Sequence, residues 1–212
     1  VLAQLDRLYL PFVSAYFKFR DAISLTMIAG ENRMRESMHD KHARKALDEM
    51  RLKENRVDDE AWIEQLLSNN SHAVLATTHH DQPFVTPVLF VYLQAQKAVC
   101  FHGARTGRLR ANLYYNPRVA INVSEFGRIL SHQEASEFNL EYRSVTAFGT
   151  AALVEDDQEA RRILEQLFKK YAPQLAPGKD FQPIQAEELL STAVYKIDID
   201  TWTGKQQAYS TE

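Results

Sequence analysis

The chain has few cysteines and no long apolar run. Its 212 residues include one cysteine, Cys100, which cannot form an internal disulfide, and no Cys/His spacing typical of a zinc cage. The most apolar N-terminal stretch, LYLPFVSAYF, is interrupted by Pro11 and falls well short of the roughly 20 residues that a bilayer requires. It does not end in the small-residue cleavage site of a signal peptide. These absences predict a cytoplasmic protein with no metal site and no membrane segment.

The chain also lacks an excess of basic residues. Its formal net charge is -3 at pH 7, which argues against a nucleic-acid partner, because a phosphate backbone requires a broad basic surface. Neither G-x-G-x-x-G nor GxxxxGK[ST] occurs, so Rossmann and P-loop nucleotide sites are not expected. His79 and His80 lie in a predicted turn, where adjacent rings point apart and no third metal donor is available. Any site for an anion must therefore be local.

The first 49 residues differ in character from the rest. A crowded aromatic run is followed by the charged stretch ENRMRESMHDKHARKALDEM, which is typical of a solvated helix. From Met50 the pattern changes, and Asp58 or Asp59 can cap a helix. The apolar face of that helix is expected to comprise Trp62, Ile63, Leu66 and Leu67. The sequence thus predicts a helical N-terminal extension at 1–49 and a second domain at 50–212.

Short apolar runs separated by turns predict six strands after this helix. They are expected at 73–77, 83–92, 98–102, 118–123, 142–154 and 193–199, in mostly antiparallel order. The polar stretch at 124–141 is too long for a tight turn and is a candidate lid or partner-contacting loop. Gly149 within a strand indicates a bulge or a barrel corner. With helices expected at 108–115 and up to about Tyr171, the pattern predicts a mainly β fold, a small closed or split β-barrel with peripheral helices.

Basic residues cluster where a glycine-bearing loop meets the start of a short helix. The cluster comprises Arg105, Arg108 and Arg110, beside Gly107. A solvated helix start would explain them, but cations at a helix N-terminus are mildly disfavoured by its dipole unless an anion offsets them. Free backbone N–H groups converge at the same place, so the segment is a candidate phosphate site. His102, at the end of the preceding strand, is either a structural imidazole or a ligand-facing one.

Five segments occur in a fixed order along the chain. They read QPFVTPVLFVY, FHGARTGRLRANL followed by NPRV, EYRSVTAFG with its acidic turn, KKYAP and IDIDTWTGK. Through them the chain resembles, from about Met50 to Lys205, the FMN-binding split-barrel family related to pyridoxamine 5'-phosphate oxidase, and more closely its nitroimidazole-resistance (Nim-type) branch. The resemblance implies a six-stranded antiparallel split β-barrel and a homodimer with two FMN sites at the subunit interface. Residues 1–49 match nothing in the family and are either a lineage-specific extension or an upstream translation artefact.

The resemblance also implies a set of flavin contacts. It places Thr86, Pro87 and Val88 along the edge of the flavin ring. It places His102, Gly103 and Ala104 beneath the ribityl chain, and Gly107 and Arg108 at the phosphate. Leu109 stands where relatives carry a lysine, so one phosphate charge partner is missing. Arg105 and Arg110 are close enough in sequence to supply a guanidinium instead.

Two segments later in the chain complete the implied site. Arg143 and Ser144 match the segment that reaches the neighbouring chain's flavin. Trp202 stands where related oxidases place an aromatic residue close to the cofactor. The implied site therefore needs a second copy of the chain.

The resemblance implies an FMN-binding flavoprotein oxidoreductase. Hydride would come from NADH or NADPH and electrons would pass to a small-molecule substrate of nitroaromatic or quinone type, while the protein supplies binding, orientation and a dry pocket. His102 is the candidate for acid or base catalysis, because an imidazole gains or loses a proton near neutral pH. Two alternatives stay open. One is a pyridoxamine 5'-phosphate oxidase-like enzyme, although the C-terminal arginine-rich motif of those oxidases is absent, and the other is a non-catalytic flavin- or haem-binding module.

Overall fold

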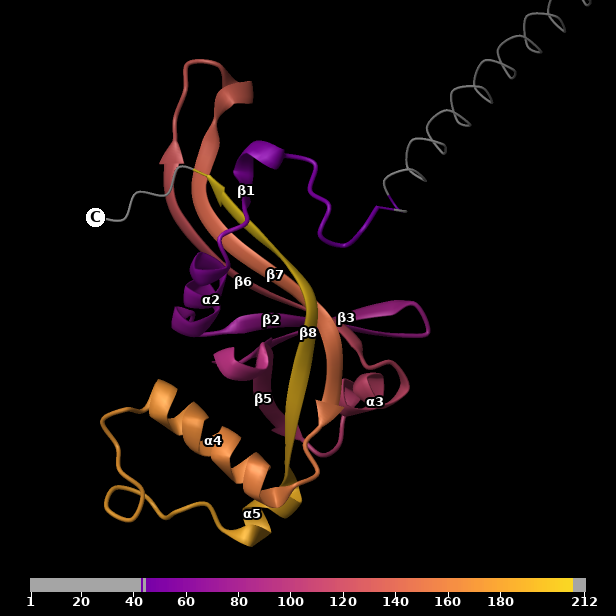
Figure 1. Ribbon diagram of the computed structural model, residues 1–212, viewed down its shortest axis with the longest axis vertical. Helices are drawn as coiled ribbons and strands as arrows, with labels where there is room; N and C mark the ends of the chain where they lie inside the picture. Colours follow the sequence, from indigo (N-terminus) through magenta and orange to yellow (C-terminus); the bar gives the residue numbers. More distant parts are fainter. Residues whose placement is uncertain (1–42, 44, 208–212) are drawn as a thin grey trace, which may run out of the picture. The chain divides into compact units, whose positions relative to one another are not determined.

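The computed structural model describes residue 43 and residues 45–207 (Figure 1). The chain divides into two compact units, Val1–Ala46 and Leu47–Glu212. The first unit lies almost entirely outside the described residues, and so does the helical extension predicted at 1–49. The sheet and the helices that pack against it belong to the second unit.

One antiparallel sheet contains all eight strands of the described residues. The strands are β1 (Arg56–Val57), β2 (Ala73–His79), β3 (Gln82–Val88), β4 (Phe90–Leu93), β5 (Ala98–Ala104), β6 (Arg118–Leu130), β7 (Asn139–Leu153) and β8 (Thr192–Gln207). They are ordered β3-β2-β6-β7-β8-β5-β4, with β1 paired to β8. The predicted mainly β, antiparallel split-barrel fold is confirmed, with eight strands in this part of the chain in place of the six expected.

A single residue joins the two ends of this sheet. β3 and β4 stand at opposite ends of the strand order, yet only Leu89 separates them in sequence. The sheet must therefore curl until the end of β3 meets the start of β4, as in a split barrel. At the edge strand β4, the Tyr171 hydroxyl accepts from the Phe90 N–H and donates to the Phe90 carbonyl, at 2.9 Å in each case. A side chain thus satisfies backbone groups that a further strand would otherwise pair.

The additional strands have simple physical origins. The run predicted as one strand at 83–92 divides at Leu89, because the chain leaves its pairing with β2 there and begins to pair with β5. An alternating pattern reports which side chains are buried but not which strand is the partner, so this change is invisible in the sequence. β1 has only two residues, too few for any pattern.

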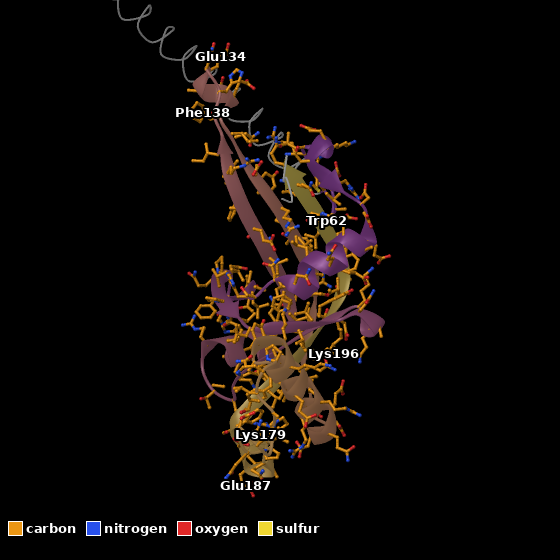
Figure 2. All side chains as sticks on the ribbon, turned by 90° about the vertical axis from the view of Figure 1, so that its left-hand side faces the viewer. Trp62, Glu134, Phe138, Lys179, Glu187 and Lys196 are labelled. Carbon is orange, nitrogen blue, oxygen red and sulfur yellow. The ribbon has the colours of Figure 1, made fainter. Side chains whose placement is uncertain are left out.

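The prediction of a loop at 124–141 is wrong, because most of this segment is strand. β6 continues to Leu130 and β7 begins at Asn139, and the two pair along an arm that extends beyond the neighbouring strands (Figure 1). Figure 2 shows Glu134 and Phe138 at the tip of this arm. Polar side chains on the arm pair with one another, as in the Arg128–Glu141 ion pair at 3.1 Å, and this polarity concealed the strands.

The β-bulge predicted from Gly149 is confirmed. Phe148 pairs with Thr201 but Gly149 pairs with Ile199, so Asp200 is an extra residue on β8. A Cβ atom at Gly149 would lie 2.1 Å from the Asp198 carbonyl oxygen. The two backbones therefore approach as closely as glycine alone permits.

Four α-helices of the described residues pack around the sheet. They are α2 (Glu60–Asn69), α3 (Arg108–Tyr115), α4 (Asp157–Tyr171) and α5 (Ala186–Ser191). Asp59 caps α2, accepting hydrogen bonds from the backbone N–H groups of Ala61 and Trp62, as one of the two predicted capping residues. None of the helices in the described part of the chain is long and apolar enough to cross a membrane.

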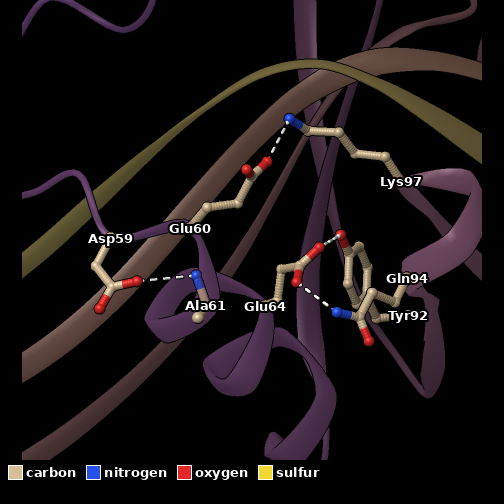
Figure 3. Close-up of polar contacts among 7 residues, drawn as sticks. All are labelled: Asp59, Glu60, Ala61, Glu64, Tyr92, Gln94 and Lys97. Atoms are coloured by element: carbon tan, nitrogen blue, oxygen red, sulfur yellow. Dashed lines mark hydrogen bonds and ion pairs between the residues drawn. The ribbon is translucent and has the colours of Figure 1, made fainter.

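Carboxylates of α2 fix that helix against the barrel (Figure 3). The Tyr92 hydroxyl donates to Glu64 Oε1 at 2.8 Å, and the Gln94 side-chain amide donates to Glu64 Oε2 at 2.7 Å. Lys97 reaches Glu60 Oε1 at 3.0 Å. The helix beside the barrel is thus tied to β4 and to the turn that follows it.

Lys170 lies on the inner side of α4, three residues beyond the buried Leu167. Its ammonium is buried without a hydrogen-bond partner, 4.0 Å from the centre of the Phe90 ring. Burial lowers the pKa of Lys170 to about 8. A charged Lys170 therefore opposes folding at neutral pH.

Lys170→Met is expected to stabilise the protein by about 1 to 2 kcal/mol at pH 7, a value reduced for partial exposure. The unfolded chain binds a proton at Lys170 up to its ordinary pKa, whereas the folded chain releases it above about pH 8. Stability should therefore rise with pH in that window for the wild type, and the advantage of Lys170→Met should shrink. Urea unfolding at pH 7 and pH 10 measures this, with Lys169→Met as the exposed control. An advantage that is equal at both pH values would contradict it.

Candidate functional site

Leu89, directly after the predicted flavin segment 86–88, lies next to His102, the first residue of the predicted segment 102–104. β4 pairs with β5 so that Phe90 is opposite Phe101, which places Leu89, the residue after β3, next to His102. Both residues line one cavity of about 260 Å³ beneath α4. Segment 86–88 thus leads directly to the residue that lies beside His102.

Thr86, on β3, carries a polar atom without a hydrogen-bond partner among the described residues. Its hydroxyl oxygen is buried and has no hydrogen-bond partner among the described residues. Such a group is destabilising unless a ligand or water bonds it, so its presence is itself an indication of a binding site. Along the same strand, Pro87 is exposed and Val88 is buried. Thr86, Pro87 and Val88 do not line the cavity beside His102.

The start of α3 is open to a ligand. Gly107, the N-cap residue, has φ 109° and ψ 178°, a backbone conformation that is essentially restricted to glycine. No side chain caps the helix, so its first N–H groups are free for an anion. Arg108 is exposed beside them and forms no hydrogen bond or ion pair with any described residue. The geometry suits a phosphate group.

Leu109 occupies the position where a lysine was expected, and the structure gives the reason. Its side chain faces β5, since a Cβ atom at Gly103 would lie 3.8 Å from Leu109 Cδ2. Leu109 is partly buried and packs against the main core. The side chain at this position therefore anchors α3 to β5.

Arg105 is directed to α5. Its Nε and Nη2 atoms donate to the Leu189 carbonyl oxygen at 3.1 Å and 2.6 Å. Part of the guanidinium is thus already used, and the loop before Gly107 is held in place. Arg110 has no hydrogen bond or ion pair among the described residues, so it keeps all its donors.

Two asparagines that the sequence reasoning missed hold the other end of α3. The Asn112 side-chain amide donates to the Thr77 hydroxyl at 2.9 Å, and that of Asn116 donates to the Thr78 hydroxyl at 2.8 Å. Asn112 is almost fully buried. An asparagine among the apolar residues of RANLYY was the sequence signal that could have identified Asn112, because a buried amide requires a specific hydrogen-bond partner.

Arg143, Ser144 and Trp202 lie elsewhere in the same chain. Arg143 donates to Glu125 Oε2 at 2.5 Å on the β6–β7 arm, and Ser144 pairs with Ser124 in the sheet. Trp202 lies on β8, with Lys97 Nζ 3.9 Å from the centre of its ring. None of the three lines the cavity beside His102.

His102 is the predicted site residue with a free side chain at the cavity. It is exposed, and its ring forms no hydrogen bond with the described residues. The rest of the cavity lining is mainly apolar and comes largely from α4. It comprises Leu89, Leu164, Leu167, Phe168, Tyr171, Ile184, Glu188 and Thr192.

Two other groups considered from the sequence have different surroundings. The His79 ring stacks on Tyr115 at 4.7 Å, and no cluster of three metal-binding side chains occurs among the residues that the structure describes. Cys100 is fully buried, and burial raises the pKa of its thiol to about 12. A thiol that stays protonated is a poor nucleophile.

Comparison with known proteins follows the same segments. The profile described as pyridoxamine 5'-phosphate oxidase matches residues 59–206. No curated protein matches the chain. Among solved structures, the flavocytochrome Anf3 from Azotobacter vinelandii is 25% identical with a TM-score of 0.67, over 76% of this chain and 73% of that one.

Two further structures share the fold. The FAD and haem binding protein from Mycobacterium smegmatis is 20% identical, with a TM-score of 0.65 over 74% of this chain and 76% of that one. A protein of Bacteroides thetaiotaomicron, described in terms of 5-nitroimidazole antibiotic resistance, is 21% identical, with a TM-score of 0.60 over 71% and 85%. Since the profile match covers most of the sequence, the chain belongs to the pyridoxamine 5'-phosphate oxidase family.

Proposed function

We propose that this protein is an FMN-dependent oxidoreductase that passes electrons from NADH or NADPH to a small acceptor of nitroaromatic or quinone type. The observation that carries the proposal is the buried Thr86 hydroxyl, which has no hydrogen-bond partner among the described residues and lies on β3, the strand that leads to Leu89 beside His102. Membership of the family and the similarity to a flavocytochrome support a flavin as the cofactor.

Each end of the flavin has candidate partners in this chain. Thr86, Pro87 and Val88 would lie along the ring, with the Thr86 hydroxyl available for a polar atom of the ring edge. His102, Gly103 and Ala104 would follow the ribityl chain. Free N–H groups after Gly107 and the guanidinium of Arg108 would hold the phosphate.

Arg105 has a positioning role in this proposal. Its bonds to the Leu189 carbonyl hold the loop that leads to Gly107, and they leave other N–H groups of the fork for the phosphate. Arg110 is the other candidate for the charge that the missing lysine would supply. Both guanidinium groups are within one helical turn of Gly107 in sequence.

A bound flavin supplies the two-electron transfer that no side chain can perform. The chain supplies the surroundings of that reaction. The apolar face of α4 excludes water from the cavity, and the His102 ring can donate or accept a proton at its edge.

The proposal includes a homodimer. Arg143, Ser144 and Trp202, which do not line the cavity beside His102, would contribute to the site of a neighbouring chain. Val85, on the same strand as Thr86, is 60% exposed, and Leu89 is 49% exposed. Apolar side chains at this place favour a protein partner. Light scattering of the purified protein should give twice the mass of one chain.

The electron donor can be tested on purified protein loaded with FMN. Under anaerobic conditions, addition of NADH or NADPH is expected to bleach the flavin absorbance, and a simple quinone should restore it. A yellow protein that neither nicotinamide bleaches would contradict the oxidoreductase proposal, and it would favour a flavin-binding module without catalysis.

Haem binding is a second candidate, favoured by one observation. His102 presents a free imidazole to an apolar cavity, the usual surroundings of a haem iron ligand. Two of the similar structures are a flavocytochrome and a FAD and haem binding protein. On this reading, added haem gives a Soret band that His102→Ala abolishes and His80→Ala keeps. Equal spectra for the two variants would remove His102 as the ligand.

A further inference from the structure

A second cavity adjoins the first. It has a volume of about 440 Å³ and lies between α4 and the proline-rich segment 172–185. Phe168 and Ile184 line both cavities, so the two cavities are neighbours and meet at these side chains. The other lining residues of the second cavity are Glu165, Lys169, Pro173, Leu175, Pro177, Phe181 and Pro183.

Local hydrogen bonds hold the wall of this second cavity. The Ala176 N–H donates to Asp180 Oδ2 and the Gly178 N–H donates to the Phe181 carbonyl, each at 2.8 Å. This compact turn presents Phe181 to Phe168, and their rings stack with centres 5.0 Å apart. Because the segment is held in this way, the cavity exists before any ligand binds.

The lining of the second cavity is mainly apolar. Three prolines, Leu175 and two stacked phenylalanine rings supply most of its lining, and its charged residues, Glu165 and Lys169, come from one turn of α4. A hydrocarbon chain is the ligand that such a surface favours.

The polar side chains of His102, Glu188 and Thr192 line the first cavity. The His102 ring and the Thr192 hydroxyl have no hydrogen-bond partner among the described side chains. The Glu188 carboxylate accepts from the Gln185 N–H at 2.7 Å. No arginine or lysine of the described residues lines this cavity, so a carboxylate or phosphate would face Glu188 without a compensating cation from this part of the chain. An uncharged head that accepts hydrogen bonds fits best.

We propose that the two cavities together bind a quinone with a hydrocarbon tail. The quinone ring occupies the first cavity, with its carbonyl oxygens facing His102 and Thr192. The tail passes Phe168 and Ile184 into the second cavity. This assignment of the acceptor rests on the proposed function, because the ring would lie beside the flavin contacts of β3 and β5.

The test compares the same benzoquinone ring with no tail and with unbranched tails of increasing length, by equilibrium dialysis against the purified protein. Each buried methylene should strengthen binding about fourfold until the second cavity is full, after which affinity should level off. Leu175→Arg places a charge in the second cavity. It should weaken binding of the decyl-tailed quinone about tenfold or more, whereas the affinity for the quinone without a tail should change by no more than about twofold. Ile184→Trp enlarges a side chain that lines both cavities, and it should also weaken binding of the decyl-tailed quinone.

Leu190→Arg is the matched control. Leu190 is 75% exposed and lines neither cavity, whereas Leu175 is 46% exposed and lines the second. Affinity that is independent of tail length, or equal losses in Leu175→Arg and Leu190→Arg, would overturn the proposal.

Flavin content measured on the same samples separates two kinds of failure. Tail-dependent binding by a protein that takes up no FMN would leave the cavity assignment standing and reject the oxidoreductase. The protein could instead be yellow and bleached by NADH or NADPH, with an affinity for quinones that does not depend on tail length. That result would reject the cavity assignment alone.

Discussion

Gly149→Ala is expected to destabilise the protein by about 3 kcal/mol or more, or to prevent folding. The added methyl group would lie 2.1 Å from the Asp198 carbonyl oxygen and 3.1 Å from Ile197 Cγ2. The first of these atoms is backbone, so relief requires β7 and β8 to separate at the bulge. Those two strands lie in the middle of the strand order, and their separation disrupts the barrel.

Gly103→Ala is the matched control for this change. Gly103 also lies in a strand, but a Cβ atom there has its nearest contact at 3.8 Å, an ordinary packing distance. Its effect on stability should stay within about 0.5 kcal/mol. The comparison is made by urea unfolding without added flavin. Equal unfolding midpoints for the two variants would contradict the close approach at the bulge.

Arg108→Ala is expected to weaken FMN binding by about tenfold to a hundredfold, the usual loss for one charge-assisted hydrogen-bonding partner of a phosphate. Arg108 is exposed and unpaired at the open start of α3, so its removal should leave folding unaffected. Flavin fluorescence quenching measures the affinity. Arg108→Lys should recover part of it, because it restores the charge without the planar fork.

Riboflavin, which lacks the phosphate, provides an internal control. The wild type should prefer FMN to riboflavin, and Arg108→Ala should reduce that preference while leaving riboflavin affinity nearly unchanged. Arg162→Ala changes an exposed arginine of α4 and should behave as wild type. An FMN affinity unaltered in Arg108→Ala would remove the phosphate assignment.

The elements that the sequence predicted correctly depend on local chemistry. Asp59 caps α2 because its side chain reaches N–H groups two and three residues away, and Gly149 marks a bulge because its missing Cβ permits a close approach. Alternating apolar residues placed most strands. Each of these signals lies within a few residues of the feature that it predicts.

The features that the sequence did not predict depend on partners far along the chain. Leu89 marks a change of strand partner, the Tyr171 hydroxyl satisfies Phe90 from 81 residues away, and Arg105 bonds Leu189 from 84 residues away. The arm at 124–141 was missed because its polar side chains pair only once the two strands lie together. The predicted flavin contacts came from family resemblance, and the unpaired Thr86 hydroxyl became visible only in the folded chain.

The flavin content of the purified protein tests the central claim most directly. After gentle purification, or after incubation with FMN followed by dialysis, the protein should retain one FMN per chain and should be a dimer. High-performance chromatography of the released cofactor should identify FMN and not FAD. A colourless protein that remains without flavin after this treatment would contradict the account.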